Sequence, residues 1–418
     1  MTTEKLLRQI FGDDPGDFRI ESYDGAKVGS DDVETVVRIT SPDFFRRLVV
    51  GRGGELALSR AFVAGDIEVD GSIYDVLSIR DRAGAISVNK ELLKELARSV
   101  GIEKISDLRG QKLPPIPPEE SKLSGRLHSR QRDKESISSH YDVSNEFYQL
   151  FLGSTMVYSC AIFDSETDSL DQAQINKLDL ICRKLALKPG MRLLDIGCGW
   201  GEMVIHAAKE YGVKAVGVTI SQEQLELAEK RVAAAGVSDM VELRLQDYRD
   251  IADGPYDAIS SIGMFEHVGA KQLGAYFGNV EALLRPGGRL LNHAINWGVD
   301  IGRSNIDPNG FMARYVFPDG ELLEPGQVVS AINKTGFEVR HLESFREHYA
   351  RTLRFWVDSL EENWDEAVRL TSPGRARVWR MYMAASAVAF ESNALTLTQI
   401  LATKTVDGES TMPLRIDW

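Results

Sequence analysis

Polar side chains interrupt three otherwise apolar segments of the sequence. Glu266 lies in "GMFEHVG", His293 lies in "LLNHAI", and Tyr158, Ser159 and Cys160 interrupt "MVYSCAIF". A carboxylate is costly to bury without a partner, and a perturbed pKa is typical of groups that exchange a proton. His293 ends a predicted strand, where open α/β sheets place their ligands. We therefore interpret Glu266 and His293 as site residues.

Structural interpretations compete with these assignments. Cys160 could be an inert small core residue, and no base lies beside it in the sequence to make it a nucleophile. Tyr349, in "HYARTL", could be a core residue whose hydroxyl is satisfied locally. His267 directly follows Glu266, and we interpret it as structural or adjacent to a cofactor.

A glycine-rich turn follows the predicted strand "MRLLDIG". Gly197, Gly199 and Gly201 let the chain turn tightly and let backbone N–H groups approach a ligand. The G-x-G-x-G spacing differs from the G-x-G-x-x-G dinucleotide fingerprint, and no acidic residue follows about 20 positions later. A hydride-transferring enzyme is therefore disfavoured. Asp195 before the turn and Asp247 after the third strand make the layout similar to the S-adenosylmethionine-dependent methyltransferase fold.

Gln224 has two interpretations of equal weight. Ser221 and Gln224 have the spacing of a capping box, which explains both residues as the start of a helix. The alternative is a contact between the Gln224 side chain and the ribose or methionine part of a cofactor.

The surrounding pattern predicts the elements that position these residues. Between residues 136 and 418, short apolar strands alternate with helical segments, which indicates an α/β domain with a parallel sheet covered on both faces. Residues 1–105 mix strands such as "VETVVRIT" with helices such as "KELLKELARSV", which indicates a smaller α+β domain. Residues 106–135 form a linker, because Pro114, Pro115, Pro117 and Pro118 deny helix donors.

Composition excludes several classes of protein. The 418 residues carry a net charge of −13, which argues against a nucleic-acid binder. Three cysteines are too few for a disulfide framework, and no histidine pair has metal-ligand spacing, so we predict a reducing cytoplasm and no metal. No signal peptide and no membrane-spanning segment is visible. The basic residues between Lys122 and Lys134 are either a solvated linker or a contact with lipid phosphate groups.

Seven motifs resemble those of the cyclopropane-fatty-acyl-phospholipid synthases in order and spacing: "HYDVSNEFYQLFL", "MVYSCAIF", "LDIGCGWG", "GVTISQEQ", "GMFEHVG", "ARYVFPDGEL" and "HYARTLRFW". The segment "SPDFFRRLVVGRGGELALSRAFVAGDIEVDG" resembles the N-terminal lipid-associated domain of the same family. The resemblance implies a Rossmann-like methyltransferase fold with a seven-stranded, mostly parallel sheet. It implies an enzyme that methylates the cis double bond of a phospholipid acyl chain through a carbocation.

Site residues follow from matching motif positions. The resemblance implies S-adenosylmethionine contacts at Tyr158, Ser159, Asp195, Gly197, Gly199, Thr219, Gln224, Gln246, Asp247 and Tyr248. It also implies a bound bicarbonate that takes a proton from the carbocation in an apolar site without water. The predicted bicarbonate ligands are the backbone N–H groups of Cys160 and Ile295 together with Glu266, His293 and Tyr349.

Two departures from the family pattern concern the site. Glu146 stands where the family often has aspartate, and we hypothesise that it lies near a lid and influences proton handling; a favourable charge at a helix N-terminus is the equal alternative. Glu202 stands where the family often has glycine, which leaves the turn intact. The polar segment "NWGVDIGRSNIDPNG" is a lid candidate.

The resemblance leaves the product and the partners open. The same family makes cyclopropanes and methylene or methyl branches, a 10-methylene product among them, and a methylene product would need a downstream reductase. Phospholipid acyl chains imply peripheral membrane binding, and a homodimer is expected from the resemblance alone. A methyltransferase of a soluble small molecule and a non-catalytic lipid-binding protein are the alternative functions.

Overall fold

The computed structural model describes residues 2–51, 54–78, 90–100, 114–121, 132, 143–299, 307 and 310–418. The predicted basic segment between Lys122 and Lys134 lies almost entirely outside these residues, and so does much of the lid candidate. Residues 114–121 of the predicted linker contain neither helix nor strand.

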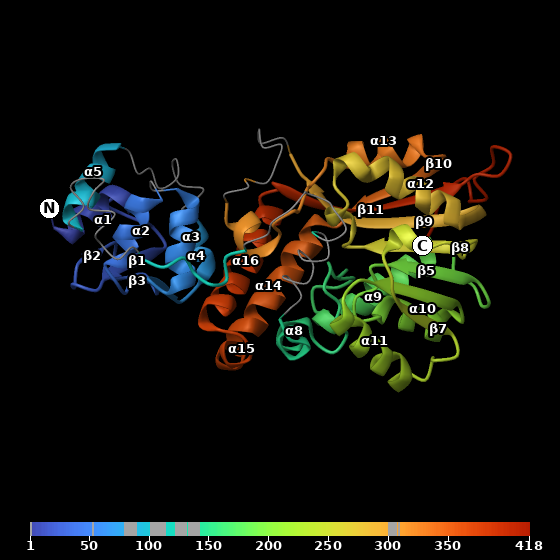
Figure 1. The fold of residues 1–418 in the computed structure, drawn as a ribbon, viewed down its shortest axis with the longest axis horizontal. Coiled ribbons are helices and arrows are strands. Elements are labelled where there is room, and N and C mark those ends of the chain that lie inside the picture. The colour runs from blue at the N-terminus through green and yellow to red at the C-terminus, as the bar shows by residue number, and fades with distance from the viewer. Residues whose placement is uncertain are drawn as a thin grey trace. The chain divides into compact units, whose positions relative to one another are not determined.

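The chain divides into two compact units (Figure 1). Unit 1 comprises Met1–Lys122, Asp307–Pro318 and Trp364–Val388, and unit 2 comprises Leu123–Ile306, Asp319–Asn363 and Ala389–Trp418. This division differs from the predicted one, because two later segments belong with the N-terminal residues. Arginines on helix α16 (Pro373–Glu391) explain part of the difference: Arg377 donates to the Val63 carbonyl, and Arg380 donates to the carbonyls of Val69 and Gly71.

Unit 1 is built around a four-stranded sheet of order β2-β1-β3-β4. Its strands are β1 (Phe18–Ser22), β2 (Lys27–Val28), β3 (Thr35–Ile39) and β4 (Ile67–Asp70). The helices near the N-terminus are α1 (Thr3–Phe11), α2 (Asp43–Val50), α3 (Glu55–Ala64), α4 (Ile73–Leu77) and α5 (Lys90–Ser99). The later segments add the π-helical turn η5 (Met312–Val316), α15 (Trp364–Leu370) and most of α16. Buried Phe44 and Leu48 of α2 contribute to one core with the sheet, as the α+β prediction requires.

Unit 2 contains a seven-stranded sheet of order β10-β11-β9-β8-β5-β6-β7. Its strands are β5 (Arg192–Ile196), β6 (Lys214–Thr219), β7 (Val241–Leu245), β8 (Tyr256–Ile262), β9 (Leu284–Trp297), β10 (Phe337–Ser344) and β11 (Leu395–Lys404). All neighbours pair in parallel except β11, which pairs antiparallel with β9 and with β10. The predicted mostly parallel, seven-stranded sheet is confirmed.

Helices cover both faces of this sheet. Alternating side chains explain why: Leu193 packs with the helices on one face, and Leu194 packs with those on the other. The first face carries α9 (Leu170–Lys184), α10 (Glu202–Tyr211) and α11 (Gln222–Ala234), and the second carries α12 (Leu273–Leu283) and α13 (Pro325–Lys334). The remaining elements are α8 (Asn145–Leu152), α14 (Arg346–Glu362) and the short turns η2 (Tyr248–Asp250), η3 (Phe265–His267) and η4 (Ala270–Gln272).

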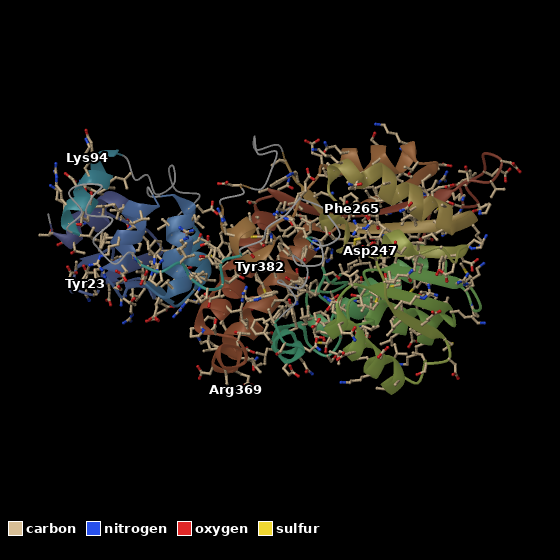
Figure 2. All side chains as sticks on the ribbon, viewed as in Figure 1. Tyr23, Lys94, Asp247, Phe265, Arg369 and Tyr382 are labelled. Atoms are coloured by element: carbon tan, nitrogen blue, oxygen red, sulfur yellow. The ribbon has the colours of Figure 1, made fainter. Side chains whose placement is uncertain are left out.

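The loops that carry the predicted site follow the carboxyl ends of the parallel strands. Asp247 and Phe265, both labelled in Figure 2, follow β7 and β8. Within the described residues, no helix has both the length and the apolar character needed to cross a bilayer.

Candidate active site

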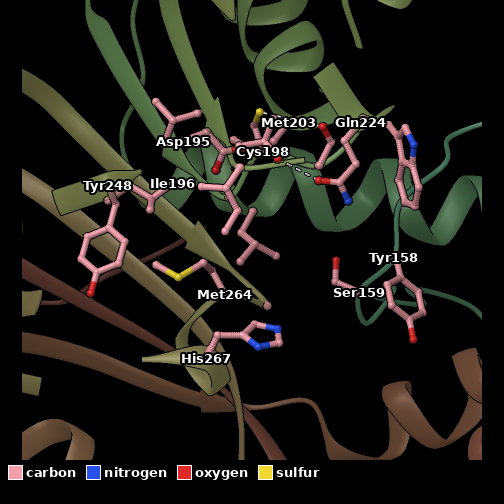
Figure 3. Close-up of a pocket in the computed structure, with 18 of the residues that line it drawn as sticks. Tyr158, Ser159, Asp195, Ile196, Cys198, Met203, Gln224, Tyr248, Met264 and His267 are labelled. Atoms are coloured by element: carbon pink, nitrogen blue, oxygen red, sulfur yellow. Dashed lines mark hydrogen bonds between the residues drawn. The ribbon is translucent and has the colours of Figure 1, made fainter. Parts of the chain in front are cut away.

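A cavity lies at the carboxyl ends of β5, β6, β7 and β8, where a parallel sheet of this kind binds its ligands (Figure 3). All of the residues predicted to contact the cofactor line it: Tyr158, Ser159, Asp195, Gly197, Gly199, Thr219, Gln224, Gln246, Asp247 and Tyr248. Eight of these residues meet because they lie at or after the ends of the neighbouring strands β5, β6 and β7, whereas Tyr158 and Ser159 come from the segment before α9. Their contact with the cofactor itself stays a prediction.

The glycine turn after β5 needs glycine for two reasons. Gly197 has a φ of +80°, which L side chains rarely adopt, and a Cβ there would lie 3.0 Å from the side chain of Met264. The turn is tied to the next strand, because the N–H groups of Gly197 and Cys198 both donate to the Val218 carbonyl at 3.0 Å. The backbone of this turn therefore forms one wall of the cavity.

Asp195 is the penultimate residue of β5, just before the turn. Its carboxylate accepts a hydrogen bond of 2.6 Å from the Ser260 hydroxyl and is 2% exposed. Burial raises the pKa of Asp195 to about 6, against the opposing effect of the Ser260 hydrogen bond.

The structure supports the helix-start interpretation for Ser221, whereas the contact of the Gln224 side chain with the cofactor stays a prediction. The Ser221 hydroxyl accepts a hydrogen bond from the Gln224 backbone N–H at 3.2 Å, so Ser221 caps α11. The Gln224 side chain does not complete the capping box; its carbonyl oxygen accepts from the Thr219 hydroxyl at 2.9 Å. Figure 3 shows the Gln224 amide at the cavity wall.

Asp247 is engaged within the protein. Its carboxylate accepts from the Arg249 backbone at 2.9 Å and from the Arg249 guanidinium at 2.6 Å. This ion pair holds the loop after β7 at the edge of the cavity, next to Tyr248, whose ring packs against Tyr276 at 5.1 Å between centroids.

Glu266 lies in η3, close behind the cavity. Its Oε1 accepts a hydrogen bond of 2.7 Å from the Ile295 N–H, and its Oε2 is buried without a partner in the described part of the chain. Burial raises the pKa of Glu266 to about 7, so the carboxyl group is poised to exchange a proton at neutral pH. The Ile295 N–H was predicted to bind bicarbonate; in the structure it holds Glu266, and the bicarbonate contact stays a prediction.

His293 is buried in β9 opposite Ile262 of β8, which lines the cavity. Its Nδ1 lies 3.2 Å from the Gln399 amide nitrogen, and its Nε2 is buried without a partner among the described residues. Burial holds the pKa of His293 well below its usual range, so the imidazole is neutral at pH 7. His293 and Ile295 lie on the same face of β9, because side chains two residues apart in a strand point the same way.

Cys160 and Tyr349 meet at one backbone carbonyl. The Cys160 thiol lies 3.8 Å from the Phe345 oxygen, which also accepts from the Tyr349 N–H at 3.1 Å. Burial raises the pKa of the thiol, which agrees with Cys160 not acting as a nucleophile. The Tyr349 ring packs against Phe390 at 4.7 Å and against Trp356 at 6.1 Å between centroids.

The predicted bicarbonate ligands do not line the cofactor cavity, but Cys160 and Glu266 are sequence neighbours of residues that do. Ser159 lines the cavity and precedes Cys160, and Met264 and His267 line it on either side of Glu266. The structure thus groups Glu266, Ile295 and His293 along β9, and Cys160 with Tyr349 at the start of α14.

Glu146 is exposed in the first turn of α8 and does not line the cavity. Hydrogen bonds to its own backbone N–H and to Ser144 lower the pKa of its carboxyl group. These are features of the helix-start alternative, which the geometry favours over a role in proton handling. Glu202 pairs with Arg231 at 2.5 Å, so this departure from the family pattern has a structural partner.

Lys177 lines the cavity and was missed from the sequence. It is 1% exposed, and its ammonium group donates to the Ser159 hydroxyl at 3.0 Å. Burial lowers the pKa of Lys177 to about 8. A signal was available, because Lys177 falls at helical spacing between buried Ala173 and Ile181 on the inner stripe of α9.

Residues 128–400 match the sequence model of the family described as mycolic acid cyclopropane synthetase. A probable fatty acid methyltransferase of Mycobacterium tuberculosis is 43% identical over 100% of both chains. A cyclopropane-fatty-acyl-phospholipid synthase of Escherichia coli is 34% identical, over 89% of this chain and 88% of its own length. A mycolic acid cyclopropane synthase solved with SAH and CTAB has a TM-score of 0.61 and 33% identity, over 65% of this chain and 98% of its own.

The raised pKa of Glu266 predicts a specific dependence of stability on pH. Below about pH 4.5 the carboxyl group is protonated in both states. Between about pH 4.5 and 7 the unfolded chain loses this proton while the folded chain retains it, so the free energy of unfolding falls as pH rises. The shift from 4.5 to about 7 corresponds to a loss of about 3 kcal/mol, which Glu266→Gln abolishes.

Urea unfolding of wild type and Glu266→Gln at pH 4.5 and pH 8 measures this effect, and Glu409→Gln, at an exposed position of unit 2, controls for loss of a carboxylate. We expect the free energy of unfolding of wild type, relative to that of Glu266→Gln, to be about 3 kcal/mol lower at pH 8 than at pH 4.5. An equal difference at both pH values would show that Glu266 ionises normally in the folded protein.

Proposed function

The chain belongs to the mycolic acid cyclopropane synthetase family, and from this we propose that it methylates the cis double bond of an unsaturated phospholipid acyl chain. The family and the enzyme class predicted from the sequence are thereby confirmed: the protein is an S-adenosylmethionine-dependent methyltransferase. The acyl substrate, the bicarbonate and the membrane contact are parts of the proposal.

The cofactor cavity fits S-adenosylmethionine, which supplies a sulfonium methyl group when bound. Gly197 leaves no room for a side chain beside Met264, so only the bare backbone of the turn borders the cavity there. The Gln224 amide and the buried Asp195 carboxylate provide polar groups on either side of this turn. Tyr158, Ser159, Thr219 and the residues after β7 would complete the binding surface.

The observation that carries the proposal is that two buried polar atoms lack partners among the described residues. Glu266 Oε2 and His293 Nε2 have no partner among the described residues, and both belong to the group of residues held along β9. Unpartnered buried polar atoms cost free energy, so they are expected to face a small polar ligand. Bicarbonate fits, because it has oxygen acceptors for a ring N–H and a hydroxyl for a carboxylate; when bound, it supplies a base.

In this arrangement Glu266 accepts and releases a proton. Its Oε1 is fixed by the Ile295 N–H, which leaves Oε2 as the exchanging atom. A carboxyl group with a pKa of about 7 can accept a proton and release it again at neutral pH. The apolar surroundings exclude water, which would otherwise capture a carbocation on the acyl chain.

The proposed substrate class rests on the descriptions of two relatives. The Escherichia coli relative is a synthase of cyclopropane fatty-acyl phospholipids, and the Mycobacterium tuberculosis relative is described as a probable fatty acid methyltransferase. We propose phospholipid acyl chains at the membrane surface as the partner, reached by peripheral binding. The fate of the carbocation decides between a cyclopropane and a methylene branch, and a reductase would convert the latter into a methyl branch.

The proposed reaction predicts methyl-labelled lipids in a host that expresses this chain. Cells fed methionine with a trideuterated methyl group should yield acyl chains that carry two deuterium atoms per added carbon, because one is lost as the proton. Mass spectrometry of the fatty acids measures the label, and catalytic hydrogenation distinguishes a methylene branch from a ring. Label found only in soluble small molecules would contradict the proposed substrate.

Glu266→Gln should lower kcat on vesicles of unsaturated phospholipid at least about a hundredfold, because a group that exchanges the proton is lost. The affinity for S-adenosylmethionine, measured by calorimetry, should stay unchanged, since Glu266 does not line the cofactor cavity. Glu409→Gln should behave as wild type. Turnover within a few-fold of wild type in Glu266→Gln would remove this residue from proton handling.

Depletion of bicarbonate should slow the reaction. In buffer freed of carbon dioxide the initial rate on vesicles should fall, and added bicarbonate should restore it in a saturable manner, because the proposed anion supplies the base. The rate is followed by methyl transfer from labelled S-adenosylmethionine. A rate independent of bicarbonate would eliminate the anion from the mechanism and leave the methyltransferase itself in place.

A further inference from the structure

Three buried side chains of unit 2 form a hydrogen-bonded chain behind the proposed anion site. Lys184 ends α9, Gln399 lies in β11, and His293 lies in β9. The Lys184 ammonium is 2.7 Å from Gln399 Oε1, and Gln399 Nε2 is 3.2 Å from His293 Nδ1. The exposed fraction is 0% for Lys184 and Gln399 and 1% for His293, so water does not compete for these contacts.

The chemistry of lysine determines the orientation of the Gln399 amide. An ammonium group only donates hydrogen bonds, so the Gln399 atom that faces Lys184 must be the carbonyl oxygen. The NH₂ group then faces His293, and Nδ1 must accept from it. A ring nitrogen that accepts carries no proton, so the single proton of the neutral imidazole lies on Nε2.

The first link of the chain is itself firmly held. Lys184 also donates to Glu343 at 2.6 Å, and its ammonium lies 5.0 Å above the ring of Phe345 and 5.7 Å from that of Trp418. These contacts balance the cost of burying the charge. The antiparallel register of β9 and β11 places Gln399 directly opposite His293, so backbone pairing fixes the second link.

We propose that Lys184 and Gln399 are positioning residues that keep His293 as the neutral tautomer protonated at Nε2. The inference rests on the proposed function, because Nε2 is the atom left without a partner on the side of the proposed anion. His293 then serves as a hydrogen-bond donor to the anion and not as the base, since Nδ1 is occupied and Nε2 already carries a proton. The anion then removes the substrate proton, and Glu266 accepts that proton from the anion.

Gln399→Glu tests the tautomer directly. The carboxylate has the same shape and still accepts from Lys184, but toward His293 it can only accept, so the imidazole proton must move to Nδ1. We expect long-range ¹H–¹⁵N spectra of the histidine-labelled protein at pH 8 to show His293 protonated at Nε2 in wild type and at Nδ1 in Gln399→Glu. The His293→Gln variant assigns the signal among the 7 histidines.

The same variant should lower kcat at least about tenfold, because Nε2 then faces the anion as an acceptor. Affinity for S-adenosylmethionine and the melting temperature should stay at wild-type values, which separates positioning from a structural role. Lys184→Met should give a mixture of both tautomers and an intermediate kcat. Without the ammonium group, the Gln399 amide is free to flip, so that either its oxygen or its NH₂ group faces His293.

Lys404→Met is the matched control. Lys404 lies at the end of β11, its side chain is 23% exposed, and it binds Glu281 and backbone carbonyls far from His293 in the sheet register. It should leave the tautomer and kcat unchanged.

An Nε2 proton in Gln399→Glu, or a shifted proton with wild-type kcat, would overturn the inference. The spectra need no lipid, so they separate the two proposals. A tautomer switch in a protein that labels no lipid would leave the positioning role standing and refute the substrate.

Discussion

The antiparallel pairing of β11 with β9 holds together the polar groups on which the proposed chemistry depends. It places Gln399 opposite His293, and it keeps β9 extended so that the Ile295 N–H reaches Glu266. Both contacts are buried, where a hydrogen bond is strong and an unpaired polar group is costly. A slip of one residue would turn His293 and Ile295 to the other face of the sheet and lose both contacts.

The same burial explains how one end of the sheet supports two kinds of environment. The cofactor cavity is bordered by the backbone of the glycine turn and by polar side chains after β5, β6 and β7. Behind it, burial raises the pKa of Glu266 to about 7, and burial together with the charges of Lys177 and Lys184 lowers the pKa of His293 and keeps it neutral. A dry region suits a carbocation, and it also makes ordinary side chains able to exchange or donate a proton at neutral pH.

Sequence patterns predicted the elements with strong periodicity and missed those whose role is set by distant partners. The strands near Thr35–Ile39, Arg192–Ile196 and Lys214–Thr219 follow from apolar runs bounded by turns. The antiparallel strand β11 and the edge strand β10 were not predicted, although β11 supplies Gln399. The segment Trp364–Val388 was assigned to the methyltransferase domain, yet it packs within unit 1 through arginines such as Arg377.

By itself the sequence determined the family, the α/β class and ten of the residues that line the cofactor cavity, because motif identity and the period of apolar residues are local properties of the chain. Tertiary structure decided which atoms meet. It placed Lys177 inside the cavity, moved Glu146 to an exposed helix start, and linked Lys184 to His293 across 109 positions through a residue on a third element. Burial and strand register produce these contacts, and both depend on segments far apart in the chain.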